Sequence, residues 1–184
     1  HILAVAAEVF ARQGIARASM NEVARACGIS KANIYHYYGS KDALVFDILD
    51  SYLAGLRDSV AKAHMEDLSS GEQLHSVCET ILLAYEGMDH EHQIQTEGLP
   101  LLPAEQQERL RGYQRDMVKQ VSGIIAGCAP ANISQDPAKM REITMSVFGM
   151  LNWFYRWHPK ATRENRISYA RTIADLTLNG VIGR

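Results

Sequence analysis

The sequence lacks the features that mark several large classes of protein. Its three cysteines, Cys27, Cys78 and Cys128, are far apart and include no CxxC pair, which argues against a disulfide framework or a zinc cluster. The longest nearly uncharged apolar stretch, residues 143–155, is shorter than the roughly 18–20 residues that span a bilayer. The chain also begins without a signal-peptide pattern. We therefore expect a cytoplasmic protein with reduced thiols and no membrane partner.

Catalytic and metal-binding patterns are missing as well. The sequence has no glycine-rich phosphate loop, no nucleophile elbow and no HExxH motif. Glu72 and His75 have the spacing of half a di-iron motif, but the other half is not found. Residues 89–92 (Asp-His-Glu-His) are rich in metal-ligating groups, but we expect them to lie in a loop, and polar loops often have this composition. We expect a non-enzymatic protein with no catalytic residues, no cofactor and no metal ion.

Proline is absent from the first half of the chain. All five prolines lie between Pro100 and Pro159, at places where the periodic pattern of apolar residues stops. Elsewhere apolar residues recur every three or four positions, and no segment shows sustained alternation of apolar and polar residues. The sequence predicts an all-α protein, with helices near residues 2–13, 20–26, 31–37, 41–65, 71–87, 103–128, 137–157 and 162–180.

Charge of neither sign is in large excess, but the charges are unevenly distributed. The formal net charge is −2, and 47% of the residues are hydrophobic, as in ordinary globular proteins. Residues 1–41 contain five Lys or Arg and two Glu, a net charge of +3, so the remainder carries −5. A basic N-terminal segment on an acidic body indicates a nucleic-acid partner for that segment.

Residues 19–38 have the pattern of a helix-turn-helix. Ser19, followed by Glu22 three positions later, is a capping box for a first short helix. Gly28 permits a left-handed conformation at the turn, and Ser30 is the N-cap of the second helix. Small or branched apolar residues would hold the two helices at a steep angle; these are Val23, Ala24, Cys27, Ile29 and Ile34.

The second helix of this motif carries side chains suited to DNA. Asn33 can bond an adenine edge, Ala32 can contact a thymine methyl, and Lys31 can hold a phosphate. Ser19 with the neighbouring helix amides, and Lys41 at the next helix start, would contact the DNA backbone on either side. The alternative for the aromatic members is that they pack between helices; these are Tyr35, Tyr37 and Tyr38.

Three motifs here resemble the N-terminal domain of TetR-family transcriptional repressors. They are Phe10-Ala-x-x-Gly14, Val23-Ala-x-x-Cys-Gly-Ile-Ser-Lys31 and Ile34-Tyr-His-Tyr-Tyr-Gly-Ser-Lys-Asp-Ala-Leu44. The resemblance covers residues 2–48. It implies a homodimer, with a three-helix DNA-binding domain over residues 1–45 and a helical ligand-binding and dimerisation domain over residues 46–184.

The resemblance also implies which residues contact double-stranded DNA. In the family, the positions of Ser19 and Lys41 touch phosphates, and the second helix of the motif faces the major groove. The expected DNA-binding residues are Ser19, Asn21, Ser30, Lys31, Ala32, Asn33, Tyr35, His36, Tyr37 and Lys41.

The predicted helix 137–157 combines an aromatic face with polar groups. Trp153 and Trp157 lie four residues apart on one face, with Asn152 and Arg156 on the adjoining face. Aromatic rings beside a planar cation suit a large, partly apolar, anionic ligand. The alternative is a solvated helix face beside an aromatic dimer core. The expected ligand-binding residues are Tyr85, Met88, Arg111, Tyr113, Arg115, Met117, Asn152, Trp153, Arg156 and Trp157.

The same helix is apolar on nearly every side, so more than one surface must cover it. In a chain of this size we expect the second cover to be another subunit, which contacts helices 137–157 and 162–180. The expected dimer-interface residues are Ile143, Val147, Phe154, Ile173, Leu176, Thr177 and Gly180.

The segment that contains both tryptophans resembles a subgroup of these repressors that responds to coenzyme A thioesters. The resemblance implies an acyl-CoA or aromatic acyl-CoA inducer, whose binding would shift the predicted helix 41–65 and release DNA. We expect a ligand-responsive dimeric repressor of a palindromic operator. The alternatives are an activator or co-regulator with the same DNA-binding domain, and a non-catalytic acyl-CoA-binding protein.

Overall fold

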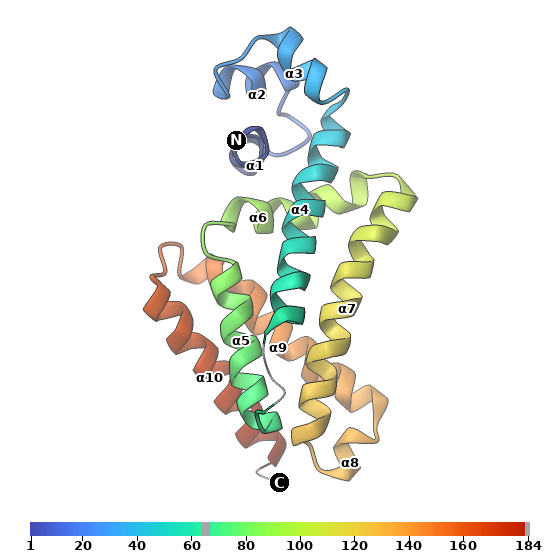
Figure 1. Cartoon of the computed structure of the whole chain (residues 1–184), viewed down its shortest axis with the longest axis vertical. Helices are drawn as coiled ribbons and strands as arrows, with labels where there is room; N and C mark the ends of the chain where they lie inside the picture. The colour runs from blue at the N-terminus through green and yellow to red at the C-terminus, as the bar shows by residue number, and fades with distance from the viewer. Residues whose placement is uncertain (64–66, 183–184) are drawn as a thin grey trace. The chain divides into compact units, whose positions relative to one another are not determined.

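The computed structural model describes residues 1–63 and 67–182, with side chains as far as Gly180. No strand occurs among these residues, and the predicted all-α class is confirmed (Figure 1). The elements are α1 (Ile2–Gln13), α2 (Met20–Ala26), α3 (Lys31–Tyr37), α4 (Lys41–Lys62), α5 (Ser70–Ala84), α6 (Asp89–Gly98), the 3-10 helix η1 (Leu99–Leu101), α7 (Ala104–Cys128), α8 (Ala131–Ser134), α9 (Pro137–Trp157) and α10 (Arg163–Ile182).

Among the described residues the eight predicted helices are present, and two further α-helices and the 3-10 helix η1 lie where we expected loops. Helices α1, α2, α3 and α9 have the predicted ends, and the others differ by up to three residues. For α4, the predicted end at residue 65 falls outside the described residues. Helices α6 and α8 were not predicted, so the interpretation of residues 89–92 as part of a loop was wrong.

The chain forms two compact units, and each is described by itself. Unit 1 contains His1–Gly55 and Gly87–Tyr113, and unit 2 contains Leu56–Glu86 and Gln114–Arg184. These units differ from a division after residue 45, because α6 packs against α1 and the first half of α4 stays with the N-terminal helices.

Helices α1, α2, α3, α4 and α7 contribute to the apolar core of unit 1. Apolar residues at helical spacing supply it, and its buried members include Ala6, Ala7, Phe10, Val23, Ile34, Leu44, Leu49 and Leu110.

Helix α6 depends on close packing within unit 1. A Cβ at Gly98, the last residue of α6, would lie 3.0 Å from Val45 Cγ1 and 3.1 Å from Ile15 Cδ1. A larger residue at this position would require the side chains of Val45 and Ile15 to shift by a few tenths of an ångström. Gln93 of the same helix donates a hydrogen bond to the carbonyl of Ala11 at 3.1 Å, which satisfies one of the last carbonyls of α1.

Unit 2 is built on α5, α9 and α10. Helices α5 and α10 lie side by side and contact each other extensively (Figure 1). Phe154 of α9 stacks on Tyr169 of α10, with ring centroids 4.8 Å apart. Among the described residues, no helix is long and apolar enough to cross a bilayer.

Candidate nucleic-acid interface

Helix α2 begins with the predicted capping box. Ser19 Oγ accepts a hydrogen bond from the backbone N–H of Glu22 at 3.3 Å, and the Glu22 carboxylate accepts from both the N–H and the hydroxyl of Ser19 at 2.8 Å. These bonds lower the pKa of Glu22 below its ordinary value. The hydroxyl proton of Ser19 is directed at Glu22, so donation to a phosphate requires the hydroxyl to rotate.

The turn between α2 and α3 uses a glycine in the left-handed region. Gly28 has a φ of +69°, and Ile29 N–H donates to the carbonyl of Ala24 at 3.0 Å. Ser30 Oγ then accepts from the N–H of Asn33 at 3.1 Å and caps α3. The helices therefore start and stop at local signals that do not depend on the rest of the fold.

Helix α3 buries one residue and exposes the rest. Ile34 is its buried residue, and it fixes the helix on the core of unit 1. Tyr37 is 65% exposed, and Tyr35 lies with its ring centroid 5.9 Å from the ammonium of Lys31. All the residues predicted to contact DNA from α3 are exposed, namely Lys31, Ala32, Asn33, Tyr35, His36 and Tyr37.

The packing alternative applies to one of the three tyrosines. Tyr38, the C-cap of α3, is half-buried, and burial raises the pKa of its hydroxyl. Tyr35 and Tyr37 are exposed. Ser19, Asn21 and the α3 N-cap Ser30 are also exposed, so a surface with donors, acceptors and aromatic rings surrounds α3.

Lys41 differs from the other predicted DNA-binding residues because it is half-buried. Its ammonium lies 2.6 Å from the carbonyl oxygen of Ile15, 3.2 Å from that of Ala16 and 3.1 Å from that of Ala18. These carbonyls belong to the loop that joins α1 to α2.

The predicted ligand-binding residues fall into both units. Met88, Arg111 and Tyr113 belong to unit 1, and the other seven belong to unit 2. Within unit 2, the buried hydroxyl of Tyr85 donates to Oδ1 of Asn152 at 2.7 Å, and the guanidinium of Arg156 lies 5.3 Å from the ring centroid of Trp153. The structure therefore brings together two pairs from the predicted set.

Tyr113 takes part in a polar cluster that the sequence did not reveal. Its hydroxyl donates to Oδ1 of Asp50 on α4 at 3.1 Å, and Arg109 donates to the other carboxylate oxygen at 2.9 Å. Arg109 also donates to the hydroxyl of Tyr113 at 3.0 Å. Within unit 1, this cluster joins α4 to the start of α7.

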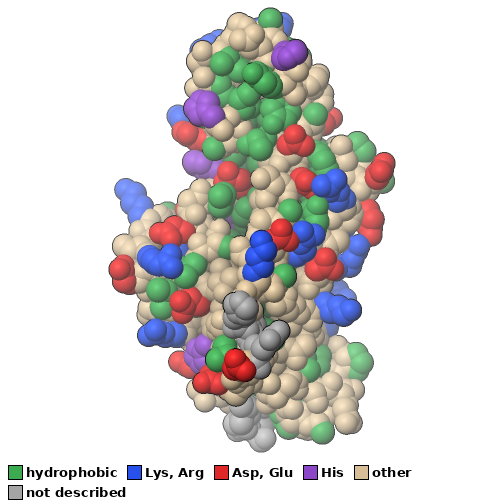
Figure 2. Space-filling view, in the orientation of Figure 1, with side chains coloured by type: hydrophobic (Ala, Val, Ile, Leu, Met, Phe, Trp, Pro, Cys, Tyr) green, Lys and Arg blue, Asp and Glu red, His purple; other side chains and the backbone are tan. Residues whose placement is uncertain are grey.

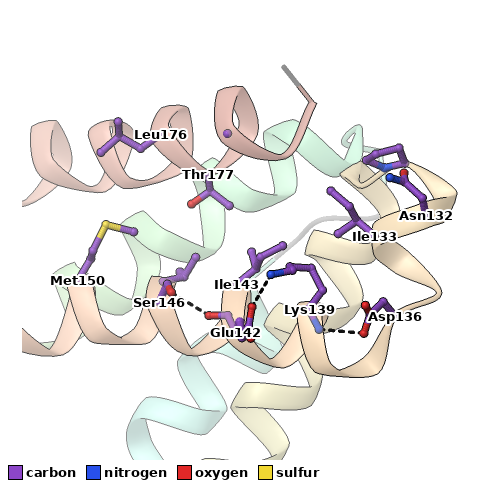
Figure 3. A pocket seen from close by; sticks show the side chains of 13 residues that line it. Asn132, Ile133, Asp136, Lys139, Glu142, Ile143, Ser146, Met150, Leu176 and Thr177 are labelled. Atoms are coloured by element: carbon purple, nitrogen blue, oxygen red, sulfur yellow. Dashed lines mark hydrogen bonds and ion pairs between the residues drawn. The ribbon is translucent and has the colours of Figure 1, made fainter. Parts of the chain in front are cut away.

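The predicted dimer residues divide between the core of unit 2 and an open groove. Phe154 and Ile173 are buried in the core. The other five line a groove of about 580 Å³ between α8, α9 and α10. Figure 3 shows Ile143 and Met150 of α9 and Thr177 of α10 pointing into the space between the two helices, with Asp136, Lys139 and Glu142 along the edge.

The two tryptophans continue the groove face of α9. Ser146, Met150, Trp153 and Trp157 follow one another at spacings of four, three and four residues, which places them on one side of a helix. Trp153 is 59% exposed and Trp157 is 52% exposed. The aromatic residues predicted for a ligand and the apolar residues predicted for a dimer therefore share a helix face.

Charged side chains do not gather into one basic patch on the face in view. Figure 2 shows Lys and Arg side chains interspersed with Asp and Glu side chains there. In the described part of the chain, no three His, Cys, Asp or Glu side chains are placed to hold a metal ion. His92, from the ligand-rich stretch 89–92, instead lies with Nδ1 2.7 Å from the hydroxyl of Tyr52.

Two family models match the chain. Residues 2–48 match the model for bacterial regulatory proteins of the tetR family, and residues 67–181 match a tetracyclin repressor-like C-terminal domain. The second match covers more than half of the chain.

Curated relatives match about half of the chain. MftR of Mycobacterium tuberculosis is 32% identical over 94 residues, which are 51% of this chain and 45% of that protein. The HTH-type transcriptional repressor KstR2 of Rhodococcus jostii is 29% identical over 92 residues, 50% of this chain and 43% of that protein. The matched stretch is less than half the length of each relative.

Solved structures share the fold over the whole chain. A TetR-family transcriptional regulator from Bordetella parapertussis has a TM-score of 0.89 and 26% identity, with 100% of this chain and 95% of that chain covered. AibR, in complex with isovaleryl coenzyme A and operator DNA, has a TM-score of 0.76 and 23% identity, with 98% and 95% covered. FadR from Bacillus subtilis, in complex with stearoyl-CoA, has a TM-score of 0.73 and 15% identity, with 98% and 97% covered. The last two identities support a shared fold alone.

Proposed function

The chain belongs to the TetR family of bacterial transcriptional regulators, and from that premise we propose that it is a dimeric repressor released from its operator by a small-molecule inducer. The observation that carries the proposal is the exposed polar face of α3, held by a capped helix-turn-helix. We propose that residues 1–45 bind DNA and that residues 46–184 bind the inducer and the second subunit.

The exposed face of α3 supports binding in the major groove. Lys31 can donate to a phosphate or a guanine edge, and Asn33 can form two hydrogen bonds with an adenine edge. A second copy would place its own α3 in the next major groove, about 34–36 Å away, so the operator is a pseudo-palindrome. Each subunit brings a net charge of +3 over residues 1–41, which favours encounter with DNA.

The groove of unit 2 supports a second copy of the chain as the partner. Its floor is apolar, with Ile143, Val147 and Met150 from α9, and its edge carries Lys139 and Glu142. Leu176 of α10, which also lines the groove, is 60% exposed. A two-fold interface pairs each apolar position with the same surface on the partner and covers the exposed tryptophans of α9.

Acyl-CoA-bound structures of the same fold support a coenzyme A thioester as the inducer. If the second copy leaves this face of α9 open, Arg156 beside Trp153 offers a planar cation and an aromatic ring, which suit a phosphate and an adenine. Release of DNA by a factor of about 5–150 requires a coupling free energy of roughly 1–3 kcal/mol between the two sites.

Operator binding tests the DNA-binding part of the proposal. Duplexes that bind the wild-type chain would be selected from a random pool, and binding would be measured by fluorescence anisotropy for wild type, Lys31→Ala and Asn33→Ala. We expect each α3 variant to bind about 5-fold to 150-fold more weakly, as expected for loss of a good base or phosphate contact. The matched control is Lys62→Ala, an exposed lysine on the last turn of α4. Equal affinity for all four proteins would contradict the assigned docking face.

Addition of acyl-CoA or aromatic acyl-CoA to the bound complex tests the inducer. Release of the duplex by the thioester, but not by the free acid, is the expected result. Thioester binding without any selected duplex would favour a non-catalytic acyl-CoA-binding protein. An in vitro transcription assay with the selected duplex separates repression from activation.

A further inference from the structure

Lys41 occupies a position where a positive charge has no local benefit. It is the first residue of α4, so its ammonium lies near the positive end of the helix dipole. Capping of this helix end is supplied by Ser40, whose Oγ accepts from the N–H of Ala43 at 3.1 Å. A role for the lysine must therefore come from contacts outside α4.

Those contacts are made with three backbone carbonyls of one loop. Nζ of Lys41 lies within 3.2 Å of the carbonyl oxygens of Ile15, Ala16 and Ala18. An ammonium has three N–H donors and no acceptor, so three carbonyls use its full capacity. The bonds also give partners to loop carbonyls that lie outside any helix.

The loop leads directly into the DNA-facing part of α2. Gly14 begins it with a φ of +82°, and Ile15 and Ala18 bury their side chains in unit 1. Ala18 is followed by Ser19, the N-cap of α2. A carbonyl contact at Ala18 therefore fixes the backbone one residue before Ser19 and three before Asn21.

We propose that Lys41 is a positioning residue for operator binding, which holds the loop 15–18 and the N-terminus of α2 through its three carbonyl contacts. In this proposal, Lys41 has the positioning role in place of the phosphate contact that the family resemblance implies for this position. The proposal rests on the proposed function for its effect on DNA, but the carbonyl contacts exist without DNA.

Charge-conserving substitution separates the two roles. A guanidinium binds phosphate at least as well as an ammonium, because its planar fork matches two phosphate oxygens. The same fork does not match three carbonyls that converge on one point. A positioning role predicts that Lys41→Arg and Lys41→Met both weaken operator binding, by about tenfold or more. A phosphate contact predicts that Lys41→Arg keeps the wild-type affinity.

The salt dependence of binding gives an independent readout. Each phosphate contact contributes about 0.9 to the slope of log K against log salt concentration. We expect Lys41→Met to keep the slope of Lys62→Met, the matched control from the exposed far end of α4. A slope lowered by about 0.9, with affinity retained in Lys41→Arg, would overturn the proposal.

Hydrogen exchange of the free protein tests the contacts without DNA. We expect faster exchange at the amides of residues 15–22 in both Lys41 variants than in Lys62→Met. Unchanged exchange there would overturn the positioning role even if affinity falls. If no duplex that binds the wild type can be selected, the proposed function is overturned. If wild type binds and the Lys41 variants bind equally well, only the present proposal is overturned.

Discussion

The hydroxyl of Tyr52 lies 2.7 Å from Nδ1 of His92, and this hydrogen bond joins α4 to α6. The next residue, Gln93, donates to the carbonyl of Ala11, so adjacent positions of α6 reach α4 and the end of α1. Helix α6 therefore connects α1 and α4, the two helices of unit 1 that flank the helix-turn-helix in the sequence.

Tyr52→Phe removes this hydrogen bond and keeps the ring. We expect the free energy of unfolding to fall by about 0.5–1.5 kcal/mol, the usual net contribution of one hydrogen bond. Urea unfolding followed by circular dichroism measures the change. Tyr37→Phe is the matched control, because Tyr37 is 65% exposed. Equal stability of the two variants would contradict a structural role for the Tyr52–His92 pair.

The sequence predicted the N-terminal helices to the residue because their ends are set locally. Ser19 with Glu22, Gly28 and Ser30 each act on backbone groups within a few residues. Helix α6 has no such start, since its N-cap Met88 makes no side-chain cap. Contacts with α1 and α4 stabilise this helix. The close packing at Gly98 becomes evident only when its neighbours, such as Val45 of α4, are known.

Periodicity was less informative where a helix has two apolar faces. The spacing in α9 identified Ile143 and Phe154 equally well, but Phe154 is covered by its own chain and Ile143 lines the groove. The pattern shows that two surfaces must pack against this helix, but it does not show which residues each surface buries. For Lys41, the charge and the helix position could be predicted, whereas the three carbonyls that accept its hydrogen bonds lie 23 to 26 residues away.

Acid should weaken the N-cap of α5 through Glu72. Its carboxylate accepts from the N–H and the hydroxyl of Ser69 at 2.9 and 2.6 Å, and these bonds lower the pKa of Glu72 below 4.5. A lowered pKa stabilises the folded state above pH 4.5, and the stabilisation is lost as the pH falls through the folded-state pKa. Glu72→Gln should therefore be less stable than wild type at pH 7, and the difference in stability should be smaller at pH 3.

Unfolding by urea at the two pH values measures the difference for Glu72. Glu79→Gln, two turns further along α5, is the matched control for loss of one charge. If Glu72→Gln and Glu79→Gln show the same dependence on pH, the capping box does not account for the lowered pKa.

Alkali should destabilise unit 2 through Tyr85. Its hydroxyl is buried and donates to Asn152, and burial raises the pKa well above 10. The folded state therefore keeps the proton to a higher pH than the unfolded chain, so the stabilisation is complete below pH 10 and is lost as the pH rises further. The stability of Tyr85→Phe, measured by urea unfolding from pH 8 to pH 11, should fall less steeply than that of wild type. Parallel curves for the two proteins would exclude Tyr85 as the titrating group.

The two tryptophans make the proposed dimer directly observable. Trp153 and Trp157 are the only tryptophans of the chain, and both are exposed on the groove face of α9. Leu176→Glu places a charge in the lining of that groove, where burial against a second copy would be costly. We expect wild type to have about twice the chain mass of 20.5 kDa by light scattering, and Leu176→Glu to have the mass of one chain. The tryptophan emission of the variant should shift to longer wavelength as the rings become hydrated.

Leu101→Glu is the matched control, because Leu101 is 56% exposed on η1 in unit 1 and Leu176 is 60% exposed on α10 in unit 2. A general loss of solubility or stability would affect both variants alike, whereas loss of the proposed interface affects Leu176→Glu alone. Dimers that persist in Leu176→Glu, with unchanged tryptophan emission, would mean that the subunits meet elsewhere. The aromatic face of α9 would then be available to the inducer, and a thioester added to the wild type should quench or shift the same emission.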